Sequence, residues 1–260
     1  KIDIIFHAAA YKHVPLVEKN PIDGLYNNVF STLNLCKSVE KYNVENFILI
    51  SSDKAVRPSS VMGASKRLAE LIVQAFAKNS EKSIFSMVRF GNVLDSSGSV
   101  VPLFRKQVSS GGPLTITNKE IIRYFMTVTE AAQLVIQTAS MAKGGDVFLL
   151  NMGAPVKIYD LAKQMIILSG LKIKNDKNPK GDIEIIETGL RPGEKLYEEL
   201  LIDAKAINTA NPMIFRALED SLDSNLLFNK LDQLRLSITK RNKEESLKLV
   251  KEMVRFYDSN

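Results

Sequence analysis

The segment from Ser51 to Arg67 places the strongest constraint on the fold of this chain. An apolar run at residues 47–50 leads into it and has the composition of a buried strand. A helical pattern over residues 66–77 follows it, and hydroxyl, carboxylate and lysine side chains lie between the two. Open α/β sheets bind ligands where strands end and release polar side chains into a crevice. The segment therefore predicts a ligand site at the carboxyl end of a strand.

The composition is that of a folded protein with room for a large core. Of 260 residues, 45% are hydrophobic and 25% are charged, so we expect one domain, or one domain with a side lobe. The net charge of +6 comes mostly from lysine, and no basic run is interleaved with aromatic residues, which argues against a nucleic-acid partner. The single cysteine, Cys36, excludes an internal disulfide. His7 and His13 lack a third ligand at metal spacing, so we expect no metal site.

The central segment resembles a known family. Residues Ser51–Lys54 follow an expected strand, Pro58 comes after them, and Met62 lies four residues before Lys66. This order resembles the active-site layout of extended short-chain dehydrogenases. The Asp-Lys pair resembles the branch of nucleotide-sugar 4,6-dehydratases of bacterial polysaccharide synthesis. Most relatives carry tyrosine where this chain has Met62, and that departure resembles the membrane-anchored UDP-N-acetylglucosamine 4,6-dehydratases. The run at residues 188–196, with Leu-Arg-Pro-Gly-Glu-Lys, is a second match.

The resemblance implies an α/β fold, namely the C-terminal half of a Rossmann-like doubly wound parallel sheet with a smaller α+β substrate-binding lobe. Residues 1–95 and 123–152 would form the dinucleotide-binding core. Residues 96–122 and 153–260 would form the nucleotide-sugar lobe and the C-terminal helices. Residue 1 opens onto an expected strand without the glycine-rich turn that a dinucleotide fold needs. We therefore expect a fragment of a longer protein, with the selector between NAD and NADP upstream.

Periodicity and capping residues predict the remaining elements. Proline suits the first helical turn, and a threonine before a helical pattern suits its N-cap. The expected strands are residues 2–6, 84–90, 113–117, 146–150 and 183–186, and the expected helices open at Pro21, at Val100, at Glu130 behind a Thr129 cap, at Ile158, and twice within residues 225–257.

The reaction that the resemblance implies needs an acid and a base side by side. The C5 proton of a hexose becomes acidic only when C4 is a ketone, so oxidation at C4 must come first. The resemblance assigns Lys54 as the C5 base and Asp53 as the C6 acid. Met62 has no ionisable proton, so Ser52 would relay the C4 hydroxyl proton to Lys66, the cofactor ribose or water. Met62 could equally be a packing residue.

The resemblance also implies the ligand contacts. It places Ala8, Ala9 and Lys66 beside a tightly bound NAD or NADP, and it implies that Asn28 orders Lys66 through water, with a plain surface asparagine as the alternative. Lys12 could contact phosphate or be a solvated loop lysine. The residues implied at the UDP-sugar are Lys12, Asn92, Ser99, Thr115, Arg123, Arg191 and Glu194.

These expectations combine into an NAD(P)-dependent UDP-N-acetylglucosamine 4,6-dehydratase for surface polysaccharide synthesis. A nucleotide-sugar C4 epimerase is one alternative, although it needs neither a C5 base nor a C6 acid. A catalytically silent nucleotide-sugar-binding module is another. We expect a cytoplasmic catalytic domain that reaches a membrane only through an upstream segment, and a homo-oligomeric parent. Similarity to the methionine-bearing subgroup implies retention at C5.

Overall fold

The computed structural model describes residues 1–201, 206–219 and 221–257, and the chain forms two compact units. Unit 1 comprises Lys1–Phe90, Gln133–Asn151 and Glu199–Asn260, and unit 2 comprises Gly91–Ala132 and Met152–Glu198. These boundaries differ from the division expected from the sequence. The C-terminal part from Glu199 onward belongs to unit 1, because its helices bury their apolar faces in the core of that unit.

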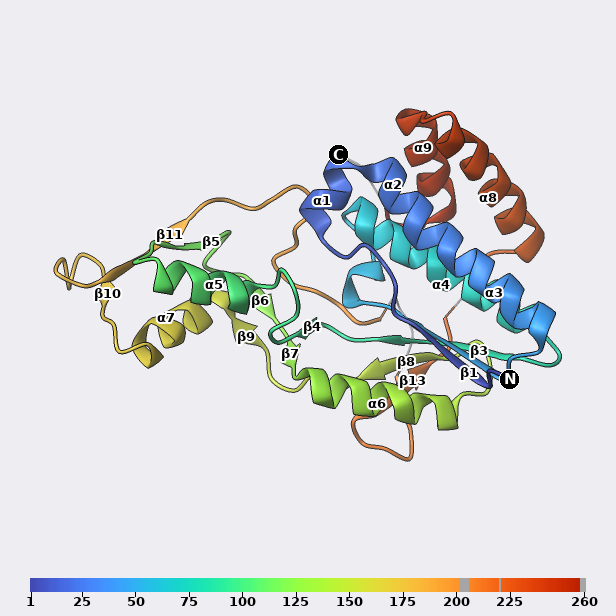
Figure 1. The fold of residues 1–260 in the computed structure, drawn as a ribbon, viewed down its shortest axis with the longest axis horizontal. Coiled ribbons are helices and arrows are strands. Elements are labelled where there is room, and N and C mark those ends of the chain that lie inside the picture. The colour runs from blue at the N-terminus through green and yellow to red at the C-terminus, as the bar shows by residue number, and fades with distance from the viewer. Residues whose placement is uncertain (202–205, 220, 258–260) are drawn as a thin grey trace. The chain divides into compact units, whose positions relative to one another are not determined.

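Unit 1 is built on a mixed sheet in the order β1-β2-β3-β8-β13-β12 (Figure 1). Strands β1 to β8 of this order run parallel, and β13 and β12 close one edge with antiparallel pairing. The parallel strands are nearly continuous apolar runs, as expected for strands covered on both faces. The expected α/β fold is confirmed. The bounds are β1 Ile4–His7, β2 Asn46–Ile50, β3 Ile84–Arg89, β8 Val147–Leu150, β12 Ile207–Asn208 and β13 Ile214–Ala217.

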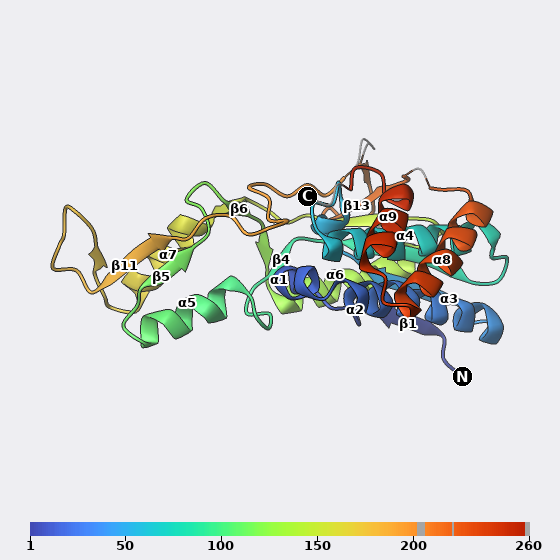
Figure 2. The same ribbon diagram turned by 90° about the horizontal axis from the view of Figure 1, so that it is seen from above.

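Helices cover both faces of this sheet. Figure 1 shows α2, α3 and α4 on one side of it and α6 on the other, which is the doubly wound arrangement. In Figure 2 the two C-terminal helices, α8 and α9, are drawn in red and pack against each other. The bounds are α1 Val14–Lys19, α2 Pro21–Leu25, a π-helical turn Tyr26–Phe30, α3 Ser31–Tyr42, α4 Val61–Asn79, α6 Val128–Met141, α8 Ser224–Thr239 and α9 Lys243–Met253.

Two helix starts differ from the expectation. Helix α4 begins at Val61 rather than Lys66, because the Ser60 hydroxyl accepts a hydrogen bond from Gly63 N at 3.1 Å and caps it. The predicted Thr129 cap of α6 is wrong. Thr127 Oγ1 accepts from Glu130 N at 3.1 Å, and the Glu130 carboxylate accepts from Thr127 N at 2.8 Å. This reciprocal capping box satisfies two backbone donors two residues earlier than predicted.

Unit 2 has its own sheet and its own core. Its main sheet has the order β10-β11-β5, and two short strand pairs, β4 with β7 and β6 with β9, accompany it. Phe104, Leu114 and Ile166 are fully buried at its centre. No helix in the described ranges is long and apolar enough to cross a membrane. The bounds are β4 Asn92–Val93, α5 Val100–Ser109, β5 Leu114–Ile116, β6 Ile122–Arg123, β7 Phe125–Met126, β9 Val156–Lys157, α7 Ile158–Leu168, β10 Ile173–Lys174 and β11 Ile183–Glu187.

Candidate active site

The turn after β2 brings three predicted catalytic side chains together. Ser52 caps a short 3₁₀ turn, Asp53–Ala55, by accepting a hydrogen bond from Lys54 N at 3.3 Å. The Ser52 hydroxyl donates to Asp53 Oδ1 at 2.7 Å, and Lys54 Nζ donates to the same oxygen at 3.0 Å. The Asp53 side chain is 3% exposed and that of Lys54 is 24% exposed. One buried carboxylate oxygen therefore links a hydroxyl and an amine that still reaches solvent.

Helix α4 packs directly against this turn. A Cβ at Gly63 would lie 2.3 Å from Lys54 O, so only glycine allows this approach. Lys66, one turn later, donates from Nζ to Ile50 O at 2.6 Å. Burial lowers the pKa of Lys66 to about 8, and the negative charge of Glu70 opposes that shift. Sequence reasoning missed Gly63, although it stands in a run of small residues beside Met62.

Two of the predicted catalytic residues have other surroundings. Met62 is 3% exposed and packs in the hydrophobic core of unit 1, as a packing residue does. The Lys66 ammonium donates to a backbone carbonyl, whereas the Ser52 hydroxyl donates to Asp53. The structure thus groups Ser52, Asp53 and Lys54, whereas Lys66 Nζ donates to the carbonyl of Ile50 at the end of β2.

Asn28 lies in the π-helical turn and is a buried connector. Its Oδ1 accepts from Tyr11 N at 2.7 Å, and its Nδ2 donates to Tyr11 O at 3.0 Å and to Ser65 Oγ at 2.9 Å. The plain surface position that the sequence left open is wrong, since Asn28 is 2% exposed. π-turns inside helices occur often at functional sites. Asn28 fixes the loop around Tyr11 and Lys12 to the residue before Lys66, and water-mediated ordering of Lys66 stays a prediction.

The end of β1 combines a neutral histidine with small exposed residues. Thr32 Oγ1 donates to Asn28 O at 2.9 Å, so the hydrogen between Thr32 and His7, 3.0 Å away, belongs to His7 Nε2. Burial, with the charge of Lys66, lowers the pKa of His7 to about 4. Ala8 and Ala9 follow and are exposed, as is Lys12. Within the described ranges no cluster of three metal-ligating side chains occurs.

In unit 2, two predicted substrate residues carry buried polar atoms without an internal partner. Asn92 begins β4, and its Nδ2 is buried without a hydrogen-bond partner among the described residues. Ser99 stands at the N-cap position of α5, yet in the described chain its buried Oγ accepts and donates no hydrogen bond. Buried polar groups are normally paired. These two atoms are therefore suited to a polar ligand group.

The remaining unit 2 candidates hold the unit together. Thr115 Oγ1 accepts from Gln107 Nε2 at 2.7 Å. Arg123 is 8% exposed, and its guanidinium donates to the carbonyls of Lys195 at 2.7 Å and Leu196 at 3.1 Å. Arg123 therefore fixes the backbone of the loop that carries Glu194.

Within that loop, Glu194 and Arg191 differ. Glu194 Oε2 accepts from Arg191 N at 3.1 Å, and its Oε1 accepts from Thr117 Oγ1 at 3.0 Å. The carboxylate of Glu194 thus closes the turn. The Arg191 side chain is exposed and makes no ion pair or hydrogen bond to the described residues. Its fork of donors is available to a phosphate.

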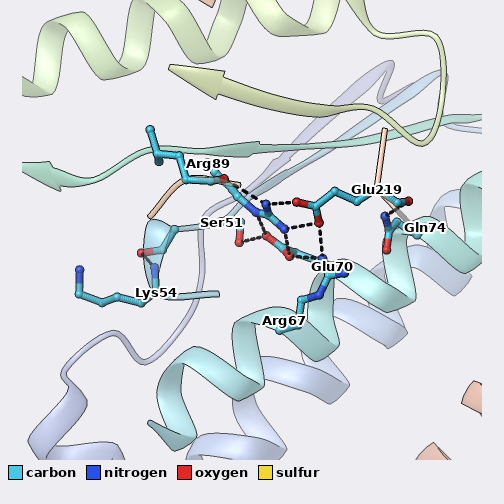
Figure 3. A network of polar contacts seen from close by, with 9 residues as sticks. Ser51, Lys54, Arg67, Glu70, Gln74, Arg89 and Glu219 are labelled. Carbon is cyan, nitrogen blue, oxygen red and sulfur yellow. Dashed lines mark hydrogen bonds and ion pairs between the residues drawn. The ribbon is translucent and has the colours of Figure 1, made fainter. Parts of the chain in front are cut away.

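Behind the turn after β2 lies a buried charge network that sequence reasoning did not predict (Figure 3). Arg89, fully buried at the end of β3, pairs with Glu70 of α4 at 2.7 Å and with Glu219 at 2.6 Å. Arg67 also contacts both carboxylates, at 2.8 and 2.9 Å. Glu70 Oε1 accepts from Ser51 Oγ at 2.6 Å. An arginine inside an apolar strand and a glutamate one turn after Lys66 are the sequence signals for it.

Comparison with known proteins identifies the family of this chain. Residues 1–219 match the model of the family described as polysaccharide biosynthesis protein. The chain belongs to this family. It is 54% identical over 197 residues to the capsular polysaccharide biosynthesis protein CapD of Staphylococcus aureus, covering 76% of this chain and 32% of that protein. The chain thus spans about a third of the length of that relative.

A second relative and two solved structures extend the comparison. The uncharacterized membrane protein MJ1061 of Methanocaldococcus jannaschii is 43% identical over 260 residues, covering 97% of this chain and 75% of that protein. The structure of Pen from Bacillus thuringiensis has a TM-score of 0.75 at 33% identity, covering 88% of this chain and 74% of that one. DesIV, a dTDP-glucose 4,6-dehydratase from Streptomyces venezuelae, shares the fold with a TM-score of 0.63 at 18% identity, covering 75% and 63%.

Proposed function

We propose that this chain is the catalytic portion of an NAD(P)-dependent 4,6-dehydratase that converts UDP-N-acetylglucosamine to the UDP-4-keto-6-deoxy sugar. The observation that carries the proposal is the Ser52–Asp53–Lys54 cluster, in which a hydroxyl and an amine share one carboxylate oxygen at 2.7 and 3.0 Å. Loss of water between C5 and C6 requires a base and an acid at adjacent carbons. Epimerisation at C4 requires neither. Membership of a polysaccharide biosynthesis family supports the pathway class.

The residues present fit the nicotinamide side of a dinucleotide. Ala8 and Ala9 are exposed small residues just beyond β1. The ammonium of Lys66, on α4, contacts Ile50 O at the end of β2, the strand that pairs with β1. When bound, NAD or NADP would accept a hydride from C4 and deliver it to C6. The structure of DesIV was solved with NAD bound, which supports a nicotinamide cofactor.

The geometry favours a shorter proton route than the sequence implied. As C4 is oxidised, its hydroxyl proton passes to Ser52 Oγ, while the Ser52 proton passes to Asp53 Oδ1, its hydrogen-bond acceptor at 2.7 Å. Asp53, now a carboxylic acid, gives that proton to the departing C6 hydroxyl, which leaves as water. The proton from the C4 hydroxyl thus reaches Asp53, the acid that the loss of the C6 hydroxyl requires. Lys66 takes no part in this relay, and its Nζ donates to Ile50 O.

Lys54 completes the proton count. As a neutral amine, Lys54 removes the C5 proton once C4 is a ketone, and it returns a proton to C5 after C6 has been reduced. A partly exposed amine exchanges its protons with water, so the product formed in heavy water carries deuterium at C5. Delivery from the same amine to the same face gives retention at C5, in agreement with the prediction from the sequence.

In unit 2, three groups are proposed to bind the nucleotide diphosphate. Asn92 Nδ2 and Ser99 Oγ are buried atoms without a partner among the described residues, and the exposed Arg191 fork matches phosphate oxygens. Thr115 and Glu194 would lie along the uridine. Arg123 is proposed to act indirectly, because its contacts hold the backbone at Lys195 and Leu196.

The parent protein is proposed to be anchored in a membrane by a segment outside these 260 residues. The support is the relative MJ1061, a protein named as a membrane protein, which this chain matches over nearly its whole length. A homo-oligomeric state of the parent stays a prediction from the sequence.

The test uses the full-length protein, UDP-N-acetylglucosamine and heavy water. We expect a product that has lost one water and carries deuterium at C5, as read by mass spectrometry and NMR. Lys54→Met should lower this rate by about 10²–10⁴-fold while UDP-sugar binding, measured by calorimetry, persists. Lys41→Met, at an exposed lysine of α3, is the control. An isomer of unchanged mass would identify an epimerase, and bound but unconverted sugar would identify a silent binding module.

A further inference from the structure

We propose that Ser51 and Glu70 are positioning residues that aim the Ser52–Asp53–Lys54 turn by locking the end of β2 to helix α4 through the buried network of Arg89, Glu219 and Arg67. This inference rests on the proposed function, because it names residues that serve the same reaction without touching the substrate. Ser51 is 5% exposed and Glu70 is fully buried, so neither is available to a ligand.

The first step of the argument is the register between α4 and the turn. Three residues of one face of α4 contact consecutive parts of the chain around the turn. Gly63 lies against Lys54 O, Lys66 Nζ donates to Ile50 O, and Glu70 Oε1 accepts from Ser51 Oγ. These helix positions are three and four residues apart and therefore share a face. The turn is held at both ends and cannot rotate without breaking one of these contacts.

The second step is the rigidity of Glu70 itself. Arg89 donates from Nε to Glu70 Oε1 and from Nη2 to Oε2, both at 2.7 Å, which is the bidentate geometry that fixes a carboxylate in plane. Arg67 Nη1 donates to Glu70 Oε2 at 2.8 Å. Glu219 accepts from Arg89 on the other side, at 2.6 and 2.8 Å. Two carboxylates and two guanidinium groups balance in charge, so the Ser51 acceptor is a fixed point (Figure 3).

The third step is the position of Ser51 in the sequence. It stands between Ile50, whose carbonyl binds Lys66, and Ser52, whose hydroxyl binds Asp53. A displacement of the Ser51 side chain therefore moves the Ser52 hydroxyl relative to both the substrate and Asp53. Misplacement of a reacting group by about 1 Å lowers rates by about 10²-fold. Backbone hydrogen bonds from Ser51 N to Val88 O at 2.8 Å and from Asp53 N to Phe90 O at 3.2 Å hold the main chain of this segment. The hydrogen bond at 2.6 Å between Ser51 Oγ and Glu70 adds the side-chain contact to α4.

The chain offers a matched control for this contact. Ser86 is a fully buried serine on β3, the strand next to β2, and its Oγ has no hydrogen-bond partner among the described residues. Ser51→Ala and Ser86→Ala remove the same atom from two buried positions, one directly after β2 and one on β3. Only the first removes a contact to the network.

The test compares both variants in the full-length protein by steady-state kinetics and by hydrogen–deuterium exchange of the peptide spanning residues 51–57. We expect Ser51→Ala to lower kcat by about 10–100-fold with KM for the UDP-sugar within about twofold, and to raise amide exchange in this peptide by about tenfold. Ser86→Ala should leave kcat and exchange unchanged. In a Glu70→Met background, which removes the acceptor of Ser51, Ser51→Ala should add less than about twofold, because the two residues act as one unit.

The exchange measurement separates this inference from the proposed function. Faster exchange in Ser51→Ala alone, in a protein that converts no nucleotide sugar, would support the positioning contact and overturn the proposed reaction. Equal kcat and equal exchange in Ser51→Ala and Ser86→Ala would overturn the positioning role, and so would a rise in KM at unchanged kcat. If Glu70→Met does not fold, the Ser51→Ala and Ser86→Ala comparison decides alone.

Discussion

The candidate residues of the two units differ in how their polar atoms are satisfied. At the end of β2, Ser51, Ser52, Asp53 and Lys66 each have an internal hydrogen-bond partner. In unit 2, Asn92 Nδ2 and Ser99 Oγ are buried without a partner in the described ranges. Groups that move protons gain from fixed positions, because the orientation is set before substrate arrives. Groups that bind a polyanion gain from unused donors, because those donors exchange no internal bond for the ligand.

The largest effect should come from removing the central arginine of the buried charge network behind the turn after β2. Arg89→Leu removes the doubly hydrogen-bonded partner of two buried carboxylates, Glu70 and Glu219, and leaves Arg67 to face both of their charges. We expect a loss of about 3–5 kcal/mol in the free energy of unfolding, measured by urea denaturation.

Arg241→Leu is the control for that experiment. Arg241 pairs with Asp23 at 3.2 Å, but both side chains are more than half exposed, so the loss should stay below about 1 kcal/mol. Equal losses in the two variants would show that the buried network is no more stabilising than a surface pair.

The next largest effect should come from acid, which lowers the free energy of unfolding through His7. Burial holds the pKa of His7 near 4 in the folded chain, below its ordinary value of 6.5. Between these values the unfolded chain binds a proton that the folded chain excludes, so the free energy of unfolding falls as the pH drops from about 6.5 to 4. The expected loss is about 2–3 kcal/mol, complete near pH 4.

The measurement is urea denaturation across that pH range. His7→Gln should flatten this part of the pH dependence, whereas His13→Gln should leave it in place. A slope that persists in His7→Gln would assign the acid sensitivity to another group.

A smaller effect, on ligand binding alone, is expected for the candidate phosphate contacts of unit 2. Arg191→Ala removes an exposed fork of donors that has no partner among the described residues, so stability should not change. UDP affinity, measured by calorimetry on the full-length protein, should fall by about 1.5–3 kcal/mol. Arg123→Ala should show the reverse order, with lost stability first, since it frees the carbonyls of Lys195 and Leu196. Unchanged UDP affinity in Arg191→Ala would remove that residue from the site.

The smallest effect should appear at Ser99. Its hydroxyl caps no helix and has no partner in the described part of the chain, so Ser99→Ala should change the free energy of unfolding by less than about 0.5 kcal/mol. A normal serine N-cap would contribute about 1 kcal/mol, as Ser60→Ala on α4 should show. A large loss of stability in Ser99→Ala would mean that this hydroxyl is satisfied within the protein in solution.

The sequence by itself determined the fold class and the place of the site. Apolar runs such as residues 47–50 are typical of strands covered on both faces, and the polar residues that follow such a strand lie at its carboxyl end. Local capping signals did not decide where helix α6 begins. Thr127 and Thr129 both precede a helical pattern, and only the reciprocal bonding with Glu130 decides between them.

Only the tertiary structure decided which polar residues support the site from behind. Arg89 and Glu219 are 130 positions apart and meet because β3 and the segment after β13 converge behind α4. A buried charge is tolerable only when its partner is present, and that partner is set by packing over long separations. The same holds for Asn28, for which the sequence left a surface position open as the alternative to a role at Lys66, and which is buried against Tyr11 and Ser65. Spacing along the chain carries no information on such contacts, because they form only when distant elements pack together.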